Sequence, residues 1–338
     1  MGTKYRIQRR TLLTGAAAFS LVPVAGARVS AQTLDKVSFQ TDWRAQAEHG
    51  GYYQAVAKGI YRRYGIECDL RQGGAQLNPA QLLVTGRADM IMSNPFQPLN
   101  YVRDGLPFLC IAAIFQKEPV IFMTHEEAGI DSFEAMRGKP MAISAASRVT
   151  HWPFLRSRFG FDDSQIRPKS VSLQPFMADK KSIWQGFVSS EPFAAMQAGI
   201  RPRVHMIADA GYDSYNTTID ISARMVAEKR DLVQRFIDAT IEGWTEYMKG
   251  EDVGAANALI RQHNPEMPED KLAYGLRAMK EHGIVQSHEA ETLGIGAMTH
   301  ERWASFYATM RDTGAYPAGL DIRRGYSLDF VNRKIGLG

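Results

Sequence analysis

The chain has 338 residues, of which 45% are hydrophobic and 22% are charged, a composition that is ordinary for a soluble globular protein. Its formal net charge is +4, and four of its basic residues lie within the first ten positions. No later stretch clusters lysine and arginine with aromatic residues, so the charge pattern excludes a nucleic-acid-binding surface. A chain of this length can bury a core that needs no disulfide or metal for stability.

Residues 1–31 have the pattern of an export signal and are set aside from the fold. Arg9 and Arg10 precede a threonine and a short apolar run, as in twin-arginine signals, and residues 29–31 fit a small-x-small cleavage site. The apolar run is interrupted by Pro23 and is too short to span a bilayer. We therefore expect a periplasmic protein that is exported by a twin-arginine-type signal.

Cys68 and Cys110 are the only cysteines, and both lie in apolar, strand-like runs. We expect buried free thiols, although two cysteines in an exported protein could also pair. The eight histidines are scattered, and no cluster of histidine, cysteine and carboxylates has the spacing of metal ligands. The sequence therefore predicts no metal site and no cofactor.

From residue 36 onward, the hydrophobic pattern alternates between strands and helices. Strands are predicted over 36–41, 66–73, 88–93 and 107–115, with helices over 50–65, 78–88 and 95–105 between them. This β-α-β rhythm is typical of a parallel sheet with helices on both faces.

The pattern then restarts, which indicates a second unit of the same kind. It predicts strands over 119–129, 139–145 and 169–174, and helices over 132–138, 147–160 and 180–188. After a strand at 216–222 the chain is mostly helical, with helices over 229–250, 254–264, 268–283 and 299–314. Two such units predict an α/β fold with two lobes, in which residues 32–123 and 219–338 form lobe 1 and residues 124–218 form lobe 2.

Ligands of open α/β sheets bind at the carboxyl ends of the strands, close to helix N-termini. Trp43 follows the first strand directly, with an acid before it and a polar loop after it, and offers a ring face for stacking. Arginine and lysine are missing from the predicted strand ends. A helix that begins near Ser147 could still bind an anion through its N-terminal N–H groups, so an anionic ligand stays an alternative. The candidate ligand-binding residues are Trp43, His49, Tyr52, Ser93, Asn94, Ser144, Ser147 and Glu191.

Several residues near these positions have a structural explanation instead. Trp152, Trp184, Phe96 and Phe176 have the spacing of core residues, and His151 fits a structural role on a helix better than ligand contact. Glu191 precedes a proline in a predicted loop, where a solvated acid is an equal alternative. The sequence has no GxSxG elbow and no glycine-rich phosphate loop after the first strand, so no catalytic set is predicted.

From about Leu34 to its end, the chain resembles the exported substrate-binding proteins of ATP-driven importers, in the branch that binds nitrate, sulfonates and thiamine precursors. The segments that carry this resemblance are TDW…EHGGYYQAVAKGIYRRYGIECDL, LLVTGRADMIMSN, SFEAMRGKPMAIS and WQGFVSSEP. The DW pair with a nearby HxG is a narrower motif. It resembles the binders of pyrimidine precursors and the related hydroxymethylpyrimidine phosphate synthases.

This resemblance implies a type II periplasmic binding protein fold, with two lobes joined by a two-segment hinge. It also implies that the protein, a monomer, captures a small heteroaromatic ligand such as a thiamine pyrimidine precursor for an ABC permease in the inner membrane. Trp43 would stack on the ring and Glu191 would pair with its nitrogens, with Tyr52 and Asn94 as companions. His49 matches the motif as well.

Two alternatives stay open. The same fold could bind a sulfonate or another small anion through the helix near Ser147. A synthase-like enzyme is the second alternative. The resemblance implies that such synthases hold pyridoxal phosphate on a lysine after the third strand and carry a cysteine-rich run. Ser93 stands where that lysine would fall and this chain has no cysteine cluster, so we expect a binding protein and not an enzyme.

Overall fold

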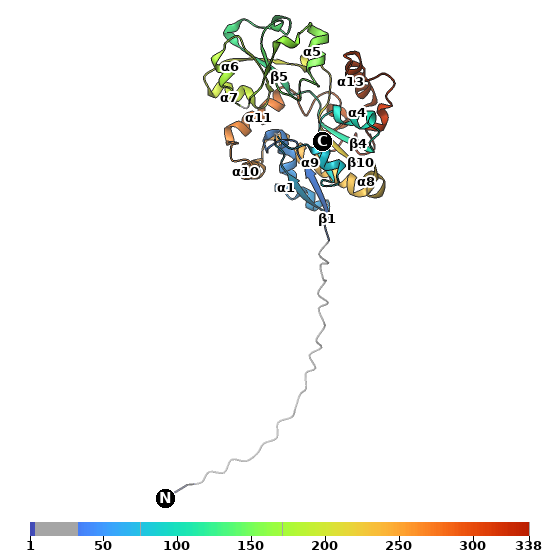
Figure 1. The fold of residues 1–338 in the computed structure, drawn as a ribbon. Coiled ribbons are helices and arrows are strands. Elements are labelled where there is room, and N and C mark those ends of the chain that lie inside the picture. The colour runs from blue at the N-terminus through green and yellow to red at the C-terminus, as the bar shows by residue number, and fades with distance from the viewer. Residues whose placement is uncertain (4–32, 75, 171, 338) are drawn as a thin grey trace. The chain divides into compact units, whose positions relative to one another are not determined.

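The structure, a computed structural model, describes residues 1–3, 33–74, 76–170 and 172–337. The predicted export signal, except for its first three residues, lies outside the described residues. From Leu34 onward the chain forms one compact unit, in which helices surround two five-stranded sheets (Figure 1). None of the described helices combines the length and the apolar character that crossing a membrane requires.

The first sheet has the strand order β2-β1-β3-β10-β4. Strand β1 is parallel to β2 and β3, whereas β10 runs antiparallel to β3 and β4. The sequence predicts a parallel sheet, but this sheet is mixed. The antiparallel strand β10 follows the strands of the second sheet in the chain and returns to the first. Its strands are β1 (Asp35–Gln40), β2 (Ile66–Arg71), β3 (Met90–Ser93), β4 (Phe108–Phe115) and β10 (Asn216–Ser222).

The second sheet repeats this arrangement with the order β7-β6-β8-β5-β9. Strand β6 is parallel to β7 and β8, and β5 runs antiparallel to β8 and β9. Its strands are β5 (Val120–His125), β6 (Met141–Ile143), β7 (Ile166–Pro168), β8 (Ile183–Phe187) and β9 (Pro202–Met206). The predicted lobe boundaries near 123 and 219 fall within β5 and β10, and the division into lobes stays a prediction.

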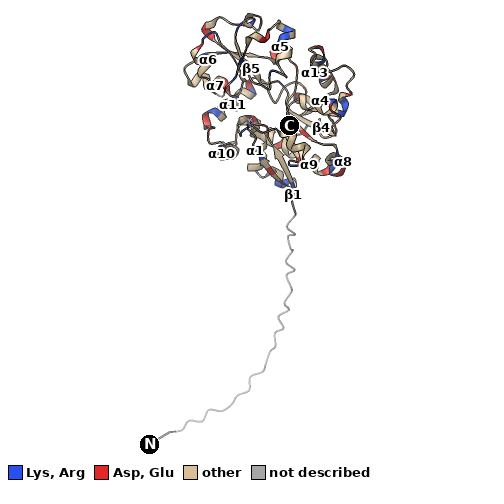
Figure 2. Ribbon diagram, in the orientation of Figure 1, with Lys and Arg blue, Asp and Glu red and all other residues tan. Residues whose placement is uncertain are grey.

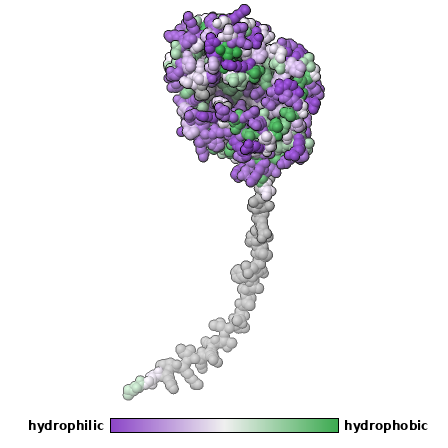
Figure 3. Space-filling model, viewed as in Figure 1, coloured by the Kyte–Doolittle hydropathy of each residue, from purple (hydrophilic) through white to green (hydrophobic). Residues whose placement is uncertain are grey.

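The described helices before β10 have at most eight residues, and all of the longer ones follow it. Before β10 lie α1 (Gly50–Ala57), α2 (Ile60–Arg63), α3 (Pro79–Val84), α4 (Phe96–Arg103), α5 (Trp152–Phe159), α6 (Gln174–Ala178) and α7 (Glu191–Gln197). After it lie α8 (Ala223–Glu228), α9 (Arg230–Lys249), α10 (Gly254–His263), α11 (Glu269–Glu281), α12 (Ala290–Leu293) and α13 (His300–Asp312). Acidic and basic residues occur on helices around both sheets (Figure 2). On the face drawn in Figure 3, hydrophilic residues cover most of the surface and apolar residues form smaller patches.

Three predicted elements differ from the structure. The helix predicted over 50–65 is two helices, because Gly59 adopts a left-handed φ of 65° between α1 and α2. The strand predicted over 169–174 is wrong, since the three-residue strand β7 ends just before it. The helix predicted over 180–188 is wrong as well, since it is the buried strand β8. Apolar runs this short have no periodicity that separates a strand from a helix.

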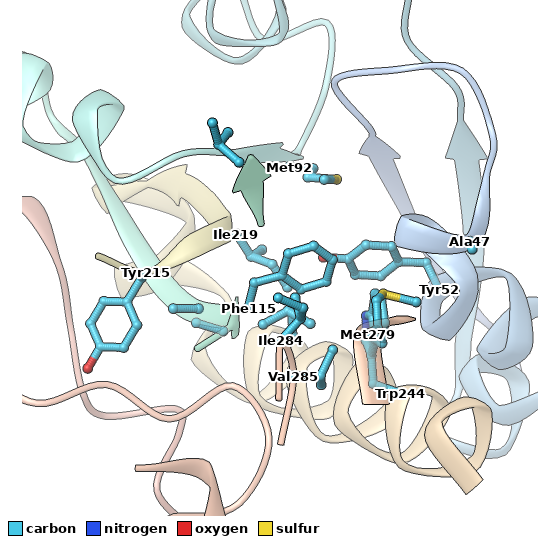
Figure 4. Packing of buried hydrophobic residues seen from close by; sticks show 14 of the residues in the cluster. Ala47, Tyr52, Met92, Phe115, Tyr215, Ile219, Trp244, Met279, Ile284 and Val285 are labelled. Atoms are coloured by element: carbon cyan, nitrogen blue, oxygen red, sulfur yellow. The ribbon is translucent and has the colours of Figure 1, made fainter. Parts of the chain in front are cut away.

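Two glycines explain how the GGYY motif begins helix α1. A Cβ on Gly50 would lie 2.0 Å from the Tyr247 ring, and a Cβ on Gly51 would lie 2.1 Å from the Trp244 ring. Glycine therefore lets α1 approach α9 closely. This contact places Tyr52 in the core, with its ring centroid 5.5 Å from that of Trp244 (Figure 4).

Candidate ligand-binding site

A cavity of about 240 Å³ lies between the two sheets, where loops from both converge. We call the residues that the first sheet and its loops contribute the first wall: Asp42, Trp43, Gln46, Glu48, His49, Met92, Phe115, Asn216 and Thr217. We call those from the second sheet and its loops the second wall: Ser144, Lys169, Gln185, Gly186, Phe187, Ser190 and Glu191. Of the predicted site residues, Trp43, His49, Ser144 and Glu191 line this cavity.

Trp43 lies on the loop that follows β1. Its carbonyl accepts hydrogen bonds from the Thr41 hydroxyl at 3.0 Å and from the Gly73 backbone N–H at 2.9 Å. These bonds fix the backbone, while the residue stays 42% exposed. The structure describes all five tryptophans, and each of the other four is at most 3% exposed. Trp43 therefore provides an indole face that the fold does not itself cover.

His49 ends the short 3₁₀ helix Ala47–His49 and is buried. Its Nδ1 accepts a hydrogen bond from the Gln46 backbone N–H at 3.3 Å, and its Nε2 lies 3.6 Å from a carboxylate oxygen of Asp42. Both ring nitrogens thus face groups of the loop that carries Trp43. This geometry gives His49 a role in holding the loop.

Glu48 joins the two walls of the cavity. Its carboxyl group is buried and accepts a hydrogen bond from the hydroxyl of Ser189, which lies in the loop after β8. Burial raises the pKa of the Glu48 carboxyl, and the Ser189 hydrogen bond offsets part of that effect. This contact ties a residue of the first wall to the loop that leads into α7.

Glu191 is the first residue of helix α7, and both of its carboxylate oxygens have partners. One accepts a hydrogen bond from the Phe187 backbone N–H at 2.8 Å, and the other lies 2.8 Å from the Lys169 ammonium nitrogen. Gly186 makes room for this side chain, because a Cβ at that position would lie 2.6 Å from the Glu191 Cβ. Glu191 is therefore held in a fixed position on the second wall.

Sequence reasoning missed Lys169, because it placed this residue at the start of a strand. The strand instead ends at Pro168, so Lys169 is the first residue after its carboxyl end and lines the cavity. The expectation that these strand ends carry no cation was therefore wrong. A three-residue strand shows no alternation of apolar and polar residues, so the pattern contained no signal for its end.

Ser144 and Ser147 belong to a hydrogen-bonded chain that starts on the second wall and continues behind it. The Ser144 backbone N–H donates to the Gln185 side chain at 2.8 Å, and the Gln185 amide donates to the Ser147 hydroxyl at 2.5 Å. The Ser147 hydroxyl also contacts His151 Nδ1 at 3.0 Å. Ser147 is buried and does not line the cavity. Helix α5 begins only at Trp152, so its N-terminus does not lie at Ser147, where the anion alternative needs it.

One residue that lines the cavity, Asn216, is hydrogen-bonded to a segment that connects the two sheets. Asn216 donates to both carboxylate oxygens of buried Glu118, at 2.9 and 3.0 Å, and so links one connection to the other. Thr217 has a φ of 50°, a conformation that is strained for a β-branched residue. Arg302 from α13 donates to backbone carbonyls on both connections, those of Gln116 and Ser214.

Besides Ser147, three other predicted site residues lie outside the cavity. Tyr52 is in the core, as described above, and burial raises its pKa. Ser93 is buried beside Asp220, whose carboxyl pKa burial raises to about 7. The Asn94 side chain accepts a hydrogen bond from the Phe96 backbone N–H at 3.1 Å, just before α4.

The structural explanations given for neighbouring residues are confirmed where burial tests them. Trp152, Trp184, Phe96 and Phe176 are all buried. Both cysteines are free thiols, with Cys110 buried and Cys68 partly buried. Within the described residues, no group of three or more histidine, cysteine or acidic side chains could hold a metal ion.

Comparisons with known proteins agree with this architecture. Residues 46–252 match the family model described as NMT1/THI5 like. The riboflavin-binding protein RibY of Chloroflexus aurantiacus is 22% identical over 329 residues, which cover 95% of this chain and 92% of that protein. The 4-amino-5-hydroxymethyl-2-methylpyrimidine phosphate synthase of Schizosaccharomyces pombe is 24% identical over 132 residues, 39% of this chain and 38% of that protein.

Among solved structures, the periplasmic aliphatic sulphonate binding protein SsuA of Escherichia coli is similar, with a TM-score of 0.63 and 14% identity. The match covers 86% of this chain and 91% of that one, and at this identity it shows the fold alone. The family model covers more than half of the chain. This protein therefore belongs to the NMT1/THI5-like family and has the fold of the periplasmic binding proteins.

Proposed function

We propose that this chain is an exported substrate-binding protein of an ABC importer, and that it captures a flat, nitrogen-bearing ring between Trp43 and Glu191. One observation carries the proposal: an uncovered indole and a fixed carboxylate line the same cavity from opposite walls. The indole suits the face of a ring, and the carboxylate suits an amino group or ring N–H at its edge.

The charges of the cavity support a ring over an anion. The carboxylates of Asp42 and Glu191 line it, against the ammonium group of Lys169. Lys169 is already paired with Glu191, so a sulfonate would meet uncompensated negative charge. Like charges that approach without a counter-ion repel, and they do so more strongly where water is partly excluded.

The relatives supply candidates for the ring. RibY is named for binding riboflavin, and the S. pombe synthase for a pyrimidine product. Both compounds contain a flat heteroaromatic ring, so an isoalloxazine or a thiamine pyrimidine precursor fits the proposal. The synthase match spans only 38% of that enzyme, and we propose ligand capture without catalysis.

Capture by two walls gives a simple mechanism for delivery. A ligand that contacts both walls stabilises the arrangement in which they lie close together, because only contacts that differ between two states can shift their balance. The Glu48–Ser189 hydrogen bond joins the same two regions and would support that arrangement. The protein, acting as a monomer, would then present its ligand to a permease in the inner membrane.

A thermal-shift screen of the mature chain tests this function. The panel contains riboflavin, lumichrome, 4-amino-5-hydroxymethyl-2-methylpyrimidine, purines, alkanesulfonates and nitrate. A ligand that binds the native state raises the melting temperature by mass action. We expect a shift with at least one ring compound and none with the anions. A shift with a sulfonate, and none with any ring, would overturn the proposal.

A further inference from the structure

Lys169 and Glu191 form an ion pair at the edge of the cavity. The Lys169 nitrogen lies 2.8 Å from one Glu191 oxygen, and both side chains are about four-fifths buried, with exposures of 20% and 23%. The other Glu191 oxygen is occupied by the Phe187 backbone N–H. The carboxylate therefore cannot turn away from the lysine without losing a second hydrogen bond.

The pair leaves hydrogen-bonding capacity on both partners. An ammonium group has three N–H donors, and Glu191 is the only partner of Lys169 within the described residues. A carboxylate oxygen can accept more than one hydrogen bond. Both residues line the cavity, so the second wall presents a donor next to an acceptor, with the two atoms 2.8 Å apart.

The ion pair also determines which ligand charge this part of the second wall can bind. Because the two opposite charges lie in contact, their fields largely cancel at the cavity. A neutral ligand edge therefore loses less solvation free energy on entering than a charged one does. The complementary edge has an acceptor atom next to an N–H donor. The carbonyl and ring N–H of a pyrimidinedione have this pattern, and so do the ring nitrogen and amino group of an aminopyrimidine.

We propose that Lys169 is a specificity-determining residue, which together with Glu191 recognises a neutral acceptor–donor edge on the ring that Trp43 stacks upon. This inference rests on the proposed function and narrows its ligand class. Lys169 donates to the ring acceptor, and Glu191 accepts from the neighbouring N–H. Flat rings without such an edge bind through Trp43 alone and are held weakly.

Two tricyclic probes and one pyrimidine test this by isothermal titration of the mature chain. Lumichrome and 4-amino-5-hydroxymethyl-2-methylpyrimidine carry an acceptor–donor edge, whereas phenazine has three fused rings without one. In the wild type we expect lumichrome to bind at least roughly tenfold more tightly than phenazine. Lys169→Met should weaken lumichrome binding roughly 10- to 100-fold, as the loss of a charged hydrogen bond does, and leave phenazine within about twofold.

Two further variants separate recognition from folding. Lys169→Arg keeps a donor beside Glu191 and should restore most of the preference for lumichrome. Lys180→Met removes an exposed lysine, paired with Glu127 on the same half of the molecule, and should change nothing. Melting temperatures of all variants check that each is folded.

The outcomes distinguish this inference from the proposed function. If Lys169→Met leaves lumichrome affinity unchanged, or weakens both tricyclic probes equally, the inference is wrong while ring capture stands. If the wild type binds none of the three probes but does bind another ring of the thermal-shift panel, this inference is wrong. If it binds no ring of that panel either, the proposed function fails as well.

Discussion

Trp43 on the first wall is held through its backbone and is 42% exposed, whereas Glu191 on the second wall is held through its side chain by two contacts. The first wall thus presents an indole face on which a flat ring can stack. The second wall presents a hydrogen-bond donor and acceptor that the ligand has to complement. We infer that stacking provides affinity for many flat rings, while the second wall selects among them.

Loss of Glu191 should have the largest effect on binding. Glu191→Ala removes the acceptor for the ring N–H and leaves the Lys169 charge and the Phe187 N–H without their partner. Lys169 also loses the partner that positions it for the ring acceptor. Because charged hydrogen bonds contribute about 1.5–3 kcal/mol each and both contacts to the ring are affected, we expect the affinity for lumichrome to fall at least roughly 100-fold.

Isothermal titration measures this loss, with Glu127→Ala as the matched control. Glu127 is an exposed acid paired with Lys180, so its removal should change the affinity less than about twofold. A smaller loss for Glu191→Ala than for a first-wall variant would reverse the comparison between the walls.

Loss of the Trp43 indole should have the next largest effect. Stacking of a ring on an aromatic side chain contributes about 1–3 kcal/mol, so Trp43→Ala should weaken lumichrome and phenazine alike by roughly tenfold or more. Trp43→Phe keeps a ring face and should recover much of the affinity. Unequal losses for the two probes would mean that Trp43 also selects among rings.

The position of Ser93 behind the first wall can be checked through its neighbour Asp220. Burial raises the pKa of Asp220 to about 7, well above that of an unfolded aspartate, so the native state keeps a proton that the unfolded state has lost. The stability that this proton provides is complete below about pH 4 and is lost as the pH rises through 7.

From pH 6 to pH 8, this group should therefore lower the free energy of unfolding by about 1.4 kcal/mol. Urea unfolding at both pH values measures the change. Asp220→Asn should remove this part of the pH dependence and leave ligand affinity as it is. An equal pH dependence in the variant would show that Asp220 does not titrate in this range. A loss of ligand affinity would place the Ser93–Asp220 region in the binding site.

The smallest effect is expected for Tyr52. Its buried hydroxyl has no hydrogen-bond partner in the part of the chain that the structure describes. Tyr52→Phe therefore removes a hydroxyl group that does not stabilise the native state. Ligand affinity should stay within about twofold and the melting temperature should stay the same or rise. A clear loss of affinity would put Tyr52 at the ligand and extend the first wall into helix α1.

The hydrophobic pattern predicted the strands of the first sheet well, because they alternate with helices and are bounded by clear glycine signals such as Gly65. It failed at β7 and β8, whose three and five residues are too short to show a period. The antiparallel entry of β10 depends on a contact with residues more than a hundred positions earlier, which local pattern does not encode.

The residues of the candidate site, too, could be predicted only in part from the local sequence. Trp43 and Tyr52 belong to one motif and follow the same strand, yet one lines the cavity and the other packs on Trp244. Only the packing of α1 against α9, made possible by Gly50 and Gly51, separates them. Lys169 could not be found from the sequence, because its position depends on where a three-residue strand ends.

A fluorescence titration of the mature chain tests most directly that a flat ring stacks on Trp43. Because Trp43 is the one exposed tryptophan of five, all of them described, its emission can be followed against four buried indoles. We expect saturable quenching of the long-wavelength emission by lumichrome or by the pyrimidine, and its disappearance in Trp43→Phe while the ring still binds by calorimetry. Binding with the same quenching in both proteins would contradict the account.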